Sequence, residues 1–162
     1  MNQSKRIKAF ADEHIPALTE FMLAYARQAH QPRLADAMSY SLAAGGKRLR
    51  PLLVYAVAAT MGADTTQLDH VAAAIEYVHT YSLIHDDLPA MDDADLRRGH
   101  ASNHVQFDEA TAILAGDALL TDAFALVSGA PQPATVRVAL TSQLAVGAGS
   151  RGMVAGQMMD IA

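Results

Sequence analysis

A short run of the chain concentrates acidic and basic side chains. Five aspartates and two arginines make it up: Asp86, Asp87, Asp92, Asp93, Asp95, Arg97 and Arg98. Carboxylates packed this closely repel one another unless a cation lies among them. Hard divalent cations such as Mg²⁺ bind through one or two carboxylates and complete their coordination with water and substrate phosphates. Arginine offers a planar fork that matches phosphate oxygens. The run predicts a site for a metal-bridged phosphate or diphosphate, although a solvated acidic loop is the alternative interpretation.

A second cluster of charge lies nearer the N-terminus. Lys47, Arg48 and Arg50 follow a glycine pair and precede Pro51, so three cations gather between two predicted helices. Cationic side chains and free backbone N–H groups in one place can bind an anion. Taken alone, the cluster could equally be a basic helix end at the surface. Together with the aspartates it predicts two phosphate-binding surfaces, one direct through Lys47 and Arg50 and one mediated by metal.

Helical spacing connects a histidine with the acidic run. His79 stands seven residues before Asp86, which returns it to nearly the same helix face two turns earlier. A lone histidine in such a helix is more often an ordinary core or surface residue, but this register aims it toward the aspartates. Asp93 is seven residues after Asp86, yet Pro89 disrupts a helix between them. Counting therefore does not decide which aspartates converge.

Two other patterns do not indicate a site. The glycines of residues 147–152 match the spacing of a dinucleotide-binding loop, but no alternation of strands and helices surrounds them. His100 and His104 could share a helix face, but no third zinc ligand accompanies them. Neither pattern changes the interpretation of the charged clusters.

The overall composition is that of one helical domain. The chain has 162 residues, of which 51% are hydrophobic, 6% aromatic and none cysteine, so it can form a core and no disulfide. A formal net charge of −5 argues against a general nucleic-acid-binding protein. Residues 1–21 lack the apolar centre of a signal peptide, and the uncharged apolar residues 51–63 are too short to span a bilayer. We therefore expect a cytoplasmic protein without a stable membrane anchor.

Apolar residues at helical spacing predict an all-α fold of six or seven helices, without a convincing strand pair. Gly45 and Gly46 suit a helix end, and Pro51 suits the first turn of the next helix. Pro89 ends the helix that leads into the aspartates, and Pro16 is expected to kink or split the first helix. The predicted helical segments are residues 5–27, 34–44, 50–62, 64–86, 108–127 and 136–162, with a linker at 128–135.

The order and spacing of these motifs resemble the trans-isoprenyl diphosphate synthases. The matching stretches are Gly-Gly-Lys-Arg-Leu-Arg-Pro at 45–51, His79, Asp-Asp-Leu-Pro-Ala-Met-Asp-Asp-Ala-Asp-Leu-Arg-Arg-Gly at 86–99, and Gly-Gln-Met-Met-Asp at 156–160. The resemblance extends over residues 37–162 and covers the N-terminal half of such an enzyme. It implies an incomplete helical bundle of the isoprenoid synthase type, in which residues 1–162 are the N-terminal portion of one polyprenyl synthase domain whose remainder is absent.

The resemblance also implies a metal site and its cofactor, Mg²⁺. Asp86 and Asp92 are the implied direct ligands, with Asp87 as a third residue of the metal site and Asp93 in support. This differs from the pairing of Asp86 with Asp93 that a regular helix would give, and we side with the family because Pro89 and two additional residues distort the turn.

The resemblance distributes the basic residues between two diphosphates. The implied substrate-binding residues are Arg97 for the allylic diphosphate, Lys47, Arg50, His79 and Arg98 for isopentenyl diphosphate, and Gln157, which with Asp160 belongs to a helix lining the cavity. The implied catalytic residues are Asp86, Asp92 and Arg97. They would ionise the allylic C–O bond, after which the double bond of isopentenyl diphosphate attacks the carbocation and loss of a proton restores an alkene.

The implied product is farnesyl diphosphate, formed from dimethylallyl or geranyl diphosphate. Tyr81, five residues before Asp86, resembles the bulky residue that limits chain length in bacterial farnesyl-forming members, although a helical tyrosine is ordinarily a core residue. A homodimer is implied, with the helix from Asp108 as our expected contact, although an apolar helix of this kind more often packs in the core. Because the family's second aspartate-rich motif is absent, we expect the chain alone to be inactive. The alternatives are a geranylgeranyl diphosphate synthase, a non-catalytic isoprenoid-diphosphate-binding subunit and a magnesium-dependent phosphohydrolase.

Overall fold

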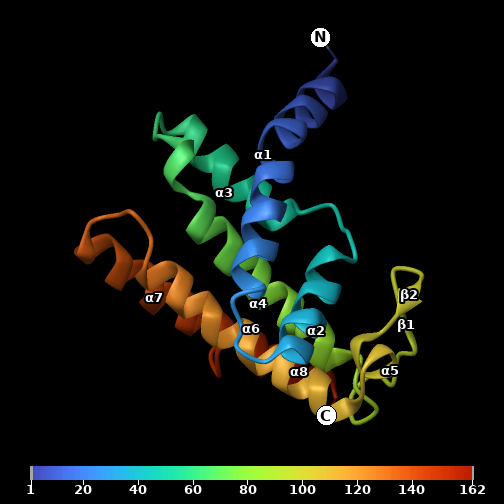
Figure 1. The fold of residues 1–162 in the computed structure, drawn as a ribbon. Coiled ribbons are helices and arrows are strands. Elements are labelled where there is room, and N and C mark those ends of the chain that lie inside the picture. The colour runs from blue at the N-terminus through green and yellow to red at the C-terminus, as the bar shows by residue number, and fades with distance from the viewer. Residues whose placement is uncertain (1, 162) are drawn as a thin grey trace.

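The computed structural model describes residues 2–161, and the predicted all-α fold is confirmed. Seven helices of eight residues or more and one short helix lie within this range (Figure 1). The elements are α1 (Gln3–Ala26), α2 (Pro32–Ala43), α3 (Leu49–Thr60), the 3₁₀ turn η1 (Thr65–Gln67), α4 (Asp69–Asp86), β1 (Leu96–Arg97), β2 (His100–Ala101), α5 (Asn103–Gln106), α6 (Glu109–Ser128), α7 (Ala134–Ala148) and α8 (Met153–Asp160).

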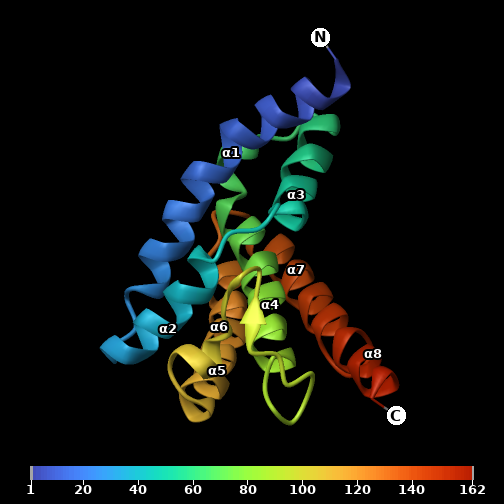
Figure 2. The ribbon, with the colours of Figure 1, turned by 90° about the vertical axis from the view of Figure 1, so that its right-hand side faces the viewer.

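Helix α4 is the central element of the bundle. It contacts α1, α2 and α3 and packs most extensively against α6 (Figures 1 and 2). Small buried residues of α6 allow this packing, since Ala112, Ala115 and Gly116 are buried and Gly116 lies directly against His85 of α4. The acidic run begins where α4 ends, so the best-packed helix of the molecule positions it.

Buried tyrosines bind the outer helices to this centre. The Tyr77 hydroxyl donates to the carbonyl of Met22 in α1 at 2.7 Å, and the Tyr55 hydroxyl of α3 donates to Asp69 Oδ1 of α4 at 2.6 Å. Each hydroxyl is thereby satisfied in an interior where an unpaired polar group would be costly. Burial raises the pKa of both tyrosines, so they stay neutral donors at physiological pH.

Several predicted boundaries differ from the structure. Helix α1 continues through Pro16, so of the expected kink or split, the split does not occur. Asp64 caps the 3₁₀ turn rather than the long helix, since its Oδ1 accepts from Thr66 N at 2.9 Å, and α4 starts only at Asp69. The last predicted helix is two helices, α7 and α8, with a turn at residues 149–152 between them.

The expectation of no strand pair is also wrong. Leu96 pairs with Ala101 and Arg97 with His100 in a two-stranded antiparallel hairpin. The two turn residues, Arg98 and Gly99, have positive φ of 55° and 83°, as a tight type I′ hairpin turn requires. Each strand has two residues, too few to produce the alternating pattern by which strands are predicted.

Helix α6 is long and apolar enough to cross a membrane, judged by length and composition alone. A core helix passes the same test, and α6 packs against α2, α4, α5 and α7. Its Asp117 and Asp122 interrupt the apolar sequence.

Candidate functional site

The loop after α4 folds back onto the end of that helix. Asp92 N donates to the carbonyl of Asp86 at 2.9 Å, and Ala94 N donates to the carbonyl of Asp87 at 3.1 Å. These bonds replace the helical pattern that Pro89 cannot continue. The fold-back brings the backbone of Asp92 beside Asp86, while the exposed Asp93 adopts a left-handed φ of 50°. Of the two pairings that the sequence left open, this geometry favours Asp86 with Asp92.

Asp87 points into the protein instead of into solvent. It is 2% exposed, and the guanidinium of Arg97 holds its carboxylate through Nε, which lies 3.0 Å from Oδ1, and through Nη2. The hydrogen bond to Asp87 is the main reason that the pKa of Arg97 is raised. A fork-shaped pair of this kind fixes both side chains. Arg97, assigned to the allylic diphosphate, is therefore engaged with Asp87 in this structure.

The last helix reaches back to the acidic loop. Gln157 Nε2 of α8 donates to Asp86 Oδ1, although the two residues are 71 positions apart. Asp160, also on α8, is exposed. The amide of Gln157 thus orients one carboxylate oxygen of Asp86, the residue implied as a metal ligand.

The residues at the end of α4 fit a magnesium ion better than a metal that needs a full protein cage. Among residues 2–161, no three His, Cys, Asp or Glu side chains form a metal-binding group. Mg²⁺ is commonly held by one or two carboxylates, with substrate phosphates and water as the other ligands. Asp86 and Asp92, whose backbones are joined by a hydrogen bond, both lie outside the buried Asp87–Arg97 pair. Two carboxylates of this kind would match that requirement.

The four residues assigned to isopentenyl diphosphate lie around one open cavity of about 460 Å³. Lys47 lies just before α3 and Arg50 in its first turn, while His79 comes from the middle of α4 and Arg98 from the hairpin turn. Gly46, Arg48, Leu49 and Glu76 complete the lining. We call this cavity the basic pocket. The structure brings together side chains from three segments, as an anion site requires.

The surroundings of His79 disfavour its charged form and lower its pKa. Burial is the main cause that lowers its pKa, and the positive charges of Arg50 and Arg98 lower it further, while Glu76 opposes them. A neutral imidazole can donate one hydrogen bond to a bound anion without contributing a charge. The positive charge of the basic pocket therefore comes from its lysine and arginines.

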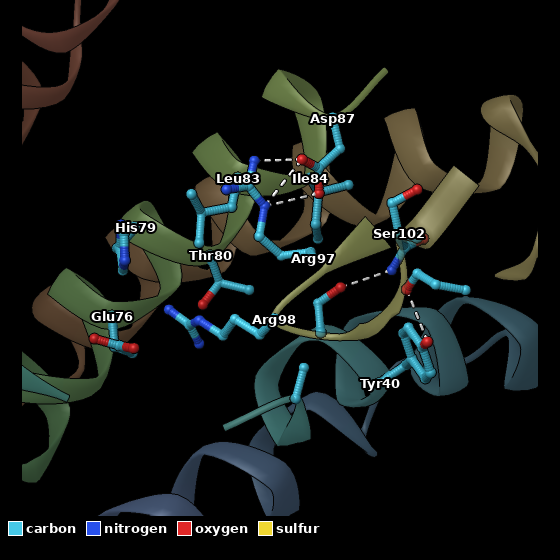
Figure 3. Close-up of a pocket in the computed structure, with 14 residues that line it drawn as sticks. Tyr40, Glu76, His79, Thr80, Leu83, Ile84, Asp87, Arg97, Arg98 and Ser102 are labelled. Atoms are coloured by element: carbon cyan, nitrogen blue, oxygen red, sulfur yellow. Dashed lines mark hydrogen bonds and ion pairs between the residues drawn. The ribbon is translucent and has the colours of Figure 1, made fainter. Parts of the chain in front are cut away.

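The hairpin directs Arg97 of β1 to the acidic loop and Arg98 of its turn to the basic pocket. Figure 3 shows Arg97 directed toward Asp87, whereas Arg98 extends toward Glu76 and His79. The guanidinium of Arg98 donates to the carbonyl of Gly45 and lies directly over Gly46. A Cβ on Gly46 would lie 2.8 Å from the guanidinium carbon, and φ there is 130°, so only glycine fits without rearrangement.

Two contacts near the site were missed in the sequence. Arg48 and Glu76 form a buried ion pair, with Nη1 2.6 Å from Oε1. His85 lies over Gly116 of α6 and donates from Nε2 to the carbonyl of Ile113 at 3.0 Å. Nothing in the chemical types of these residues distinguishes them from exposed neighbours. The small residue type at 116 was the available signal for the second contact.

Tyr81 lies in the core directly before the acidic site. It is 7% exposed, and its ring meets the imidazole of His85 edge-on with the ring centres 5.8 Å apart. Burial raises the pKa of its hydroxyl. The ring therefore adds bulk on α4 one to two turns below Asp86.

This geometry defines a class of protein: a helical bundle in which one helix carries an acidic loop at its end and a basic pocket on its side. The family model "Polyprenyl synthetase" matches residues 31–162, and the chain belongs to that family. A farnesyl diphosphate synthase of Haemophilus influenzae is 56% identical over 135 residues, covering 83% of this chain and 46% of that protein. A geranylgeranyl pyrophosphate synthase of Arabidopsis thaliana is 48% identical over 131 residues, covering 79% and 37%.

Solved structures agree with the fold. The apo crystal structure of an FPP/GFPP synthase from Zymomonas mobilis superimposes with a TM-score of 0.93 at 39% identity, covering 98% of this chain and 59% of that chain. The crystal structure of a geranyltransferase from Legionella pneumophila has a TM-score of 0.93 at 40% identity, covering 99% and 58%. The chain spans about half the length of the curated farnesyl diphosphate synthases it matches.

Proposed function

We propose that this chain is the N-terminal part of a prenyltransferase that joins dimethylallyl or geranyl diphosphate to isopentenyl diphosphate and yields farnesyl diphosphate. One observation carries the proposal: the acidic loop begins where α4 ends, His79 of the basic pocket lies about two turns earlier on the same helix, and one hairpin supplies an arginine to each site. Two diphosphates can thus bind side by side, one at the aspartates and one at the pocket. Family membership and the names of the relatives support the reaction and its product.

The residues of this chain would bind and orient both substrates. In the proposed complex, Lys47, Arg50, His79 and Arg98 hold the diphosphate of isopentenyl diphosphate, and Asp86 and Asp92, with Asp87 behind them, hold Mg²⁺. When bound, Mg²⁺ supplies positive charge that stabilises the diphosphate leaving group. Arg97 adds charge beside the same group. His79 and Asp86 stand about 10 Å apart along α4, so a rigid helix sets the separation of the two diphosphates.

A chimera tests the proposal. This chain would replace the matching N-terminal segment of the Haemophilus influenzae farnesyl diphosphate synthase, to which it is 56% identical over 135 residues. With geranyl diphosphate, labelled isopentenyl diphosphate and Mg²⁺, we expect a C15 product. Circular dichroism would show whether the chimera is folded and unfolds cooperatively. If it is folded but incorporates no label, the result contradicts the transferase proposal and favours a non-catalytic diphosphate-binding subunit.

The 162-residue polypeptide alone should incorporate no label under the same conditions. The second aspartate-rich motif that the family uses is absent from it, so part of the charge that would stabilise the leaving group is missing. The purified chain would be assayed beside the chimera at equal concentration. Formation of C15 product by the chain itself contradicts this expectation.

Tyr81→Ala in the chimera should lengthen the product from C15 to C20 or beyond. Removal of a buried ring leaves a cavity that the surrounding helices fill only partly, and a growing prenyl chain could extend into it. Radio-thin-layer chromatography of the dephosphorylated products measures the effect. Tyr55→Phe, which alters a buried tyrosine of α3, serves as the control and should still give C15. An unchanged C15 product from Tyr81→Ala contradicts the proposed role.

Product length also separates the proposed function from its nearest alternative. The Arabidopsis thaliana relative named as a geranylgeranyl pyrophosphate synthase is almost as similar as the bacterial farnesyl diphosphate synthases. C20 as the main product of the unsubstituted chimera would therefore favour a geranylgeranyl diphosphate synthase.

We also propose that the protein forms a homodimer and is cytoplasmic. Helix α6 is the proposed contact, and two of its large apolar residues support this, since Ile113 is 44% and Leu114 59% exposed. Both side chains are exposed although α6 packs against α4, so they do not belong to the core.

A further inference from the structure

The side chain of Arg48 lies apart from the neighbouring cations of the basic pocket. Lys47 and Arg50 are exposed, whereas Arg48 is 5% exposed. Its backbone is left-handed, with φ 46° and ψ 38°, at the residue that precedes α3. This conformation is unfavourable for a residue with a Cβ. Some interaction must therefore hold the turn at Arg48.

Two hydrogen bonds of the Arg48 guanidinium supply that interaction. Nη1 donates to Glu76 Oε1 in the middle of α4 at 2.6 Å, and Nη2 donates to the carbonyl of Leu42 in the last turn of α2. Glu76 is 2% exposed, so both charges are buried and each needs the other. A cation is also favoured beside the carbonyls at a helix C-terminus. The guanidinium thus connects α2 and α4 beneath the segment that carries Lys47 and Arg50.

We propose that the Arg48–Glu76 pair is the positioning element of the basic pocket. The pair holds the left-handed turn, and the turn places Lys47 and Arg50 on either side of it toward a diphosphate bound beside His79 and Arg98. Arg48 and Glu76 act through their neighbours and are not themselves assigned a contact with the ligand. The inference rests on the proposed function, since it takes the pocket to bind a diphosphate.

Electrostatics and positioning predict opposite results when Glu76 loses its charge. Glu76 is the one carboxylate among the described residues that line the pocket. If its charge acted only through the field, removing it would tighten the binding of an anion. If the pair positions the cations, removing it should weaken binding, because Arg48 loses the partner that keeps the turn in place.

Calorimetric titration of the 162-residue chain with inorganic diphosphate, in EDTA and without Mg²⁺, distinguishes a purely electrostatic role of Glu76 from a positioning role. We expect Glu76→Met to raise Kd by about 10-fold, the effect of losing one well-placed charged hydrogen bond. Glu76→Gln keeps the size and one acceptor for Nη1, so its Kd should lie closer to that of the unsubstituted chain. Tyr55→Phe removes another buried hydrogen bond between α3 and α4 and should leave Kd within about twofold.

A second pair of variants tests the turn itself. Arg48→Ala and Arg48→Gly remove the same charge, but only glycine tolerates the left-handed conformation. We expect Arg48→Gly to bind diphosphate more tightly than Arg48→Ala. This comparison tests the positioning role of the Arg48–Glu76 pair even if Glu76→Met fails to fold.

The outcomes separate the inference from the proposed function. An unsubstituted chain that does not bind diphosphate refutes the anion pocket, and the role of the pair with it. A chain that binds, with Glu76→Met equal or tighter, refutes only the positioning role. Equal binding by Arg48→Ala and Arg48→Gly likewise refutes the turn as the means of positioning.

Discussion

Asp86→Asn in the chimera should lower kcat for C15 formation by about 10²–10³-fold, the usual cost of removing one strong electrostatic contribution to a transition state. Asparagine has nearly the same size as aspartate and keeps an acceptor for the amide of Gln157. The substitution therefore removes a charge and leaves the contact between α4 and α8 possible. Steady-state assays at several Mg²⁺ concentrations measure the effect, and the Mg²⁺ concentration for half-maximal rate should rise as well.

Asp95→Asn is the matched control for this prediction. Asp95 belongs to the same acidic run and is exposed, and its backbone carbonyl, which the substitution leaves in place, accepts from Ser102 N at 2.9 Å. If the run acted only through its total charge, both substitutions would have similar effects. We expect Asp95→Asn to change kcat less than about twofold, in keeping with small effects of exposed charges. A comparable loss in both variants contradicts a specific role for Asp86.

Helical register accounts for much of what the sequence predicted about the site. His79 and Asp86 lie on α4 as expected, and the cavity brings Lys47, Arg50, His79 and Arg98 together. Such convergence could be anticipated because the glycine pair and the proline mark where one helix ends and the next begins. The chemical roles of these residues stay predictions.

Loop geometry could not be predicted by counting. The pairing of Asp86 with Asp92 depends on a backbone hydrogen bond across the fold-back, and the inward position of Asp87 depends on Arg97 from the hairpin. Arg48 presents the same difficulty in a sharper form. In the sequence it is one of three neighbouring cations, and only the left-handed turn decides that it is the buried one.

Gly116→Ala should lower the free energy of unfolding by about 1–3 kcal/mol, the usual cost of overpacking a well-packed interior. A Cβ at this position would overlap the imidazole of His85, with Cε1 at 2.8 Å. The ring cannot move away freely, because Nε2 donates to the carbonyl of Ile113 and the edge of the ring contacts Tyr81. His85 directly precedes Asp86, so the displacement would also disturb the end of α4. Urea unfolding of the 162-residue chain measures the loss.

Gly147→Ala is the matched control, because it adds the same methyl group to a helix where, apart from the adjacent residues and the backbone of the same helix, no atom lies within 4 Å of the new carbon. It should be neutral or stabilise the chain by about 0.4–1 kcal/mol, since alanine restricts the unfolded chain more than glycine does. The double variant His85→Ala/Gly116→Ala completes the argument. The three atoms nearest to the added methyl group all belong to this ring, so the double variant should be no less stable than His85→Ala alone. If Gly116→Ala destabilises both backgrounds equally, His85 is not the reason for glycine at this position.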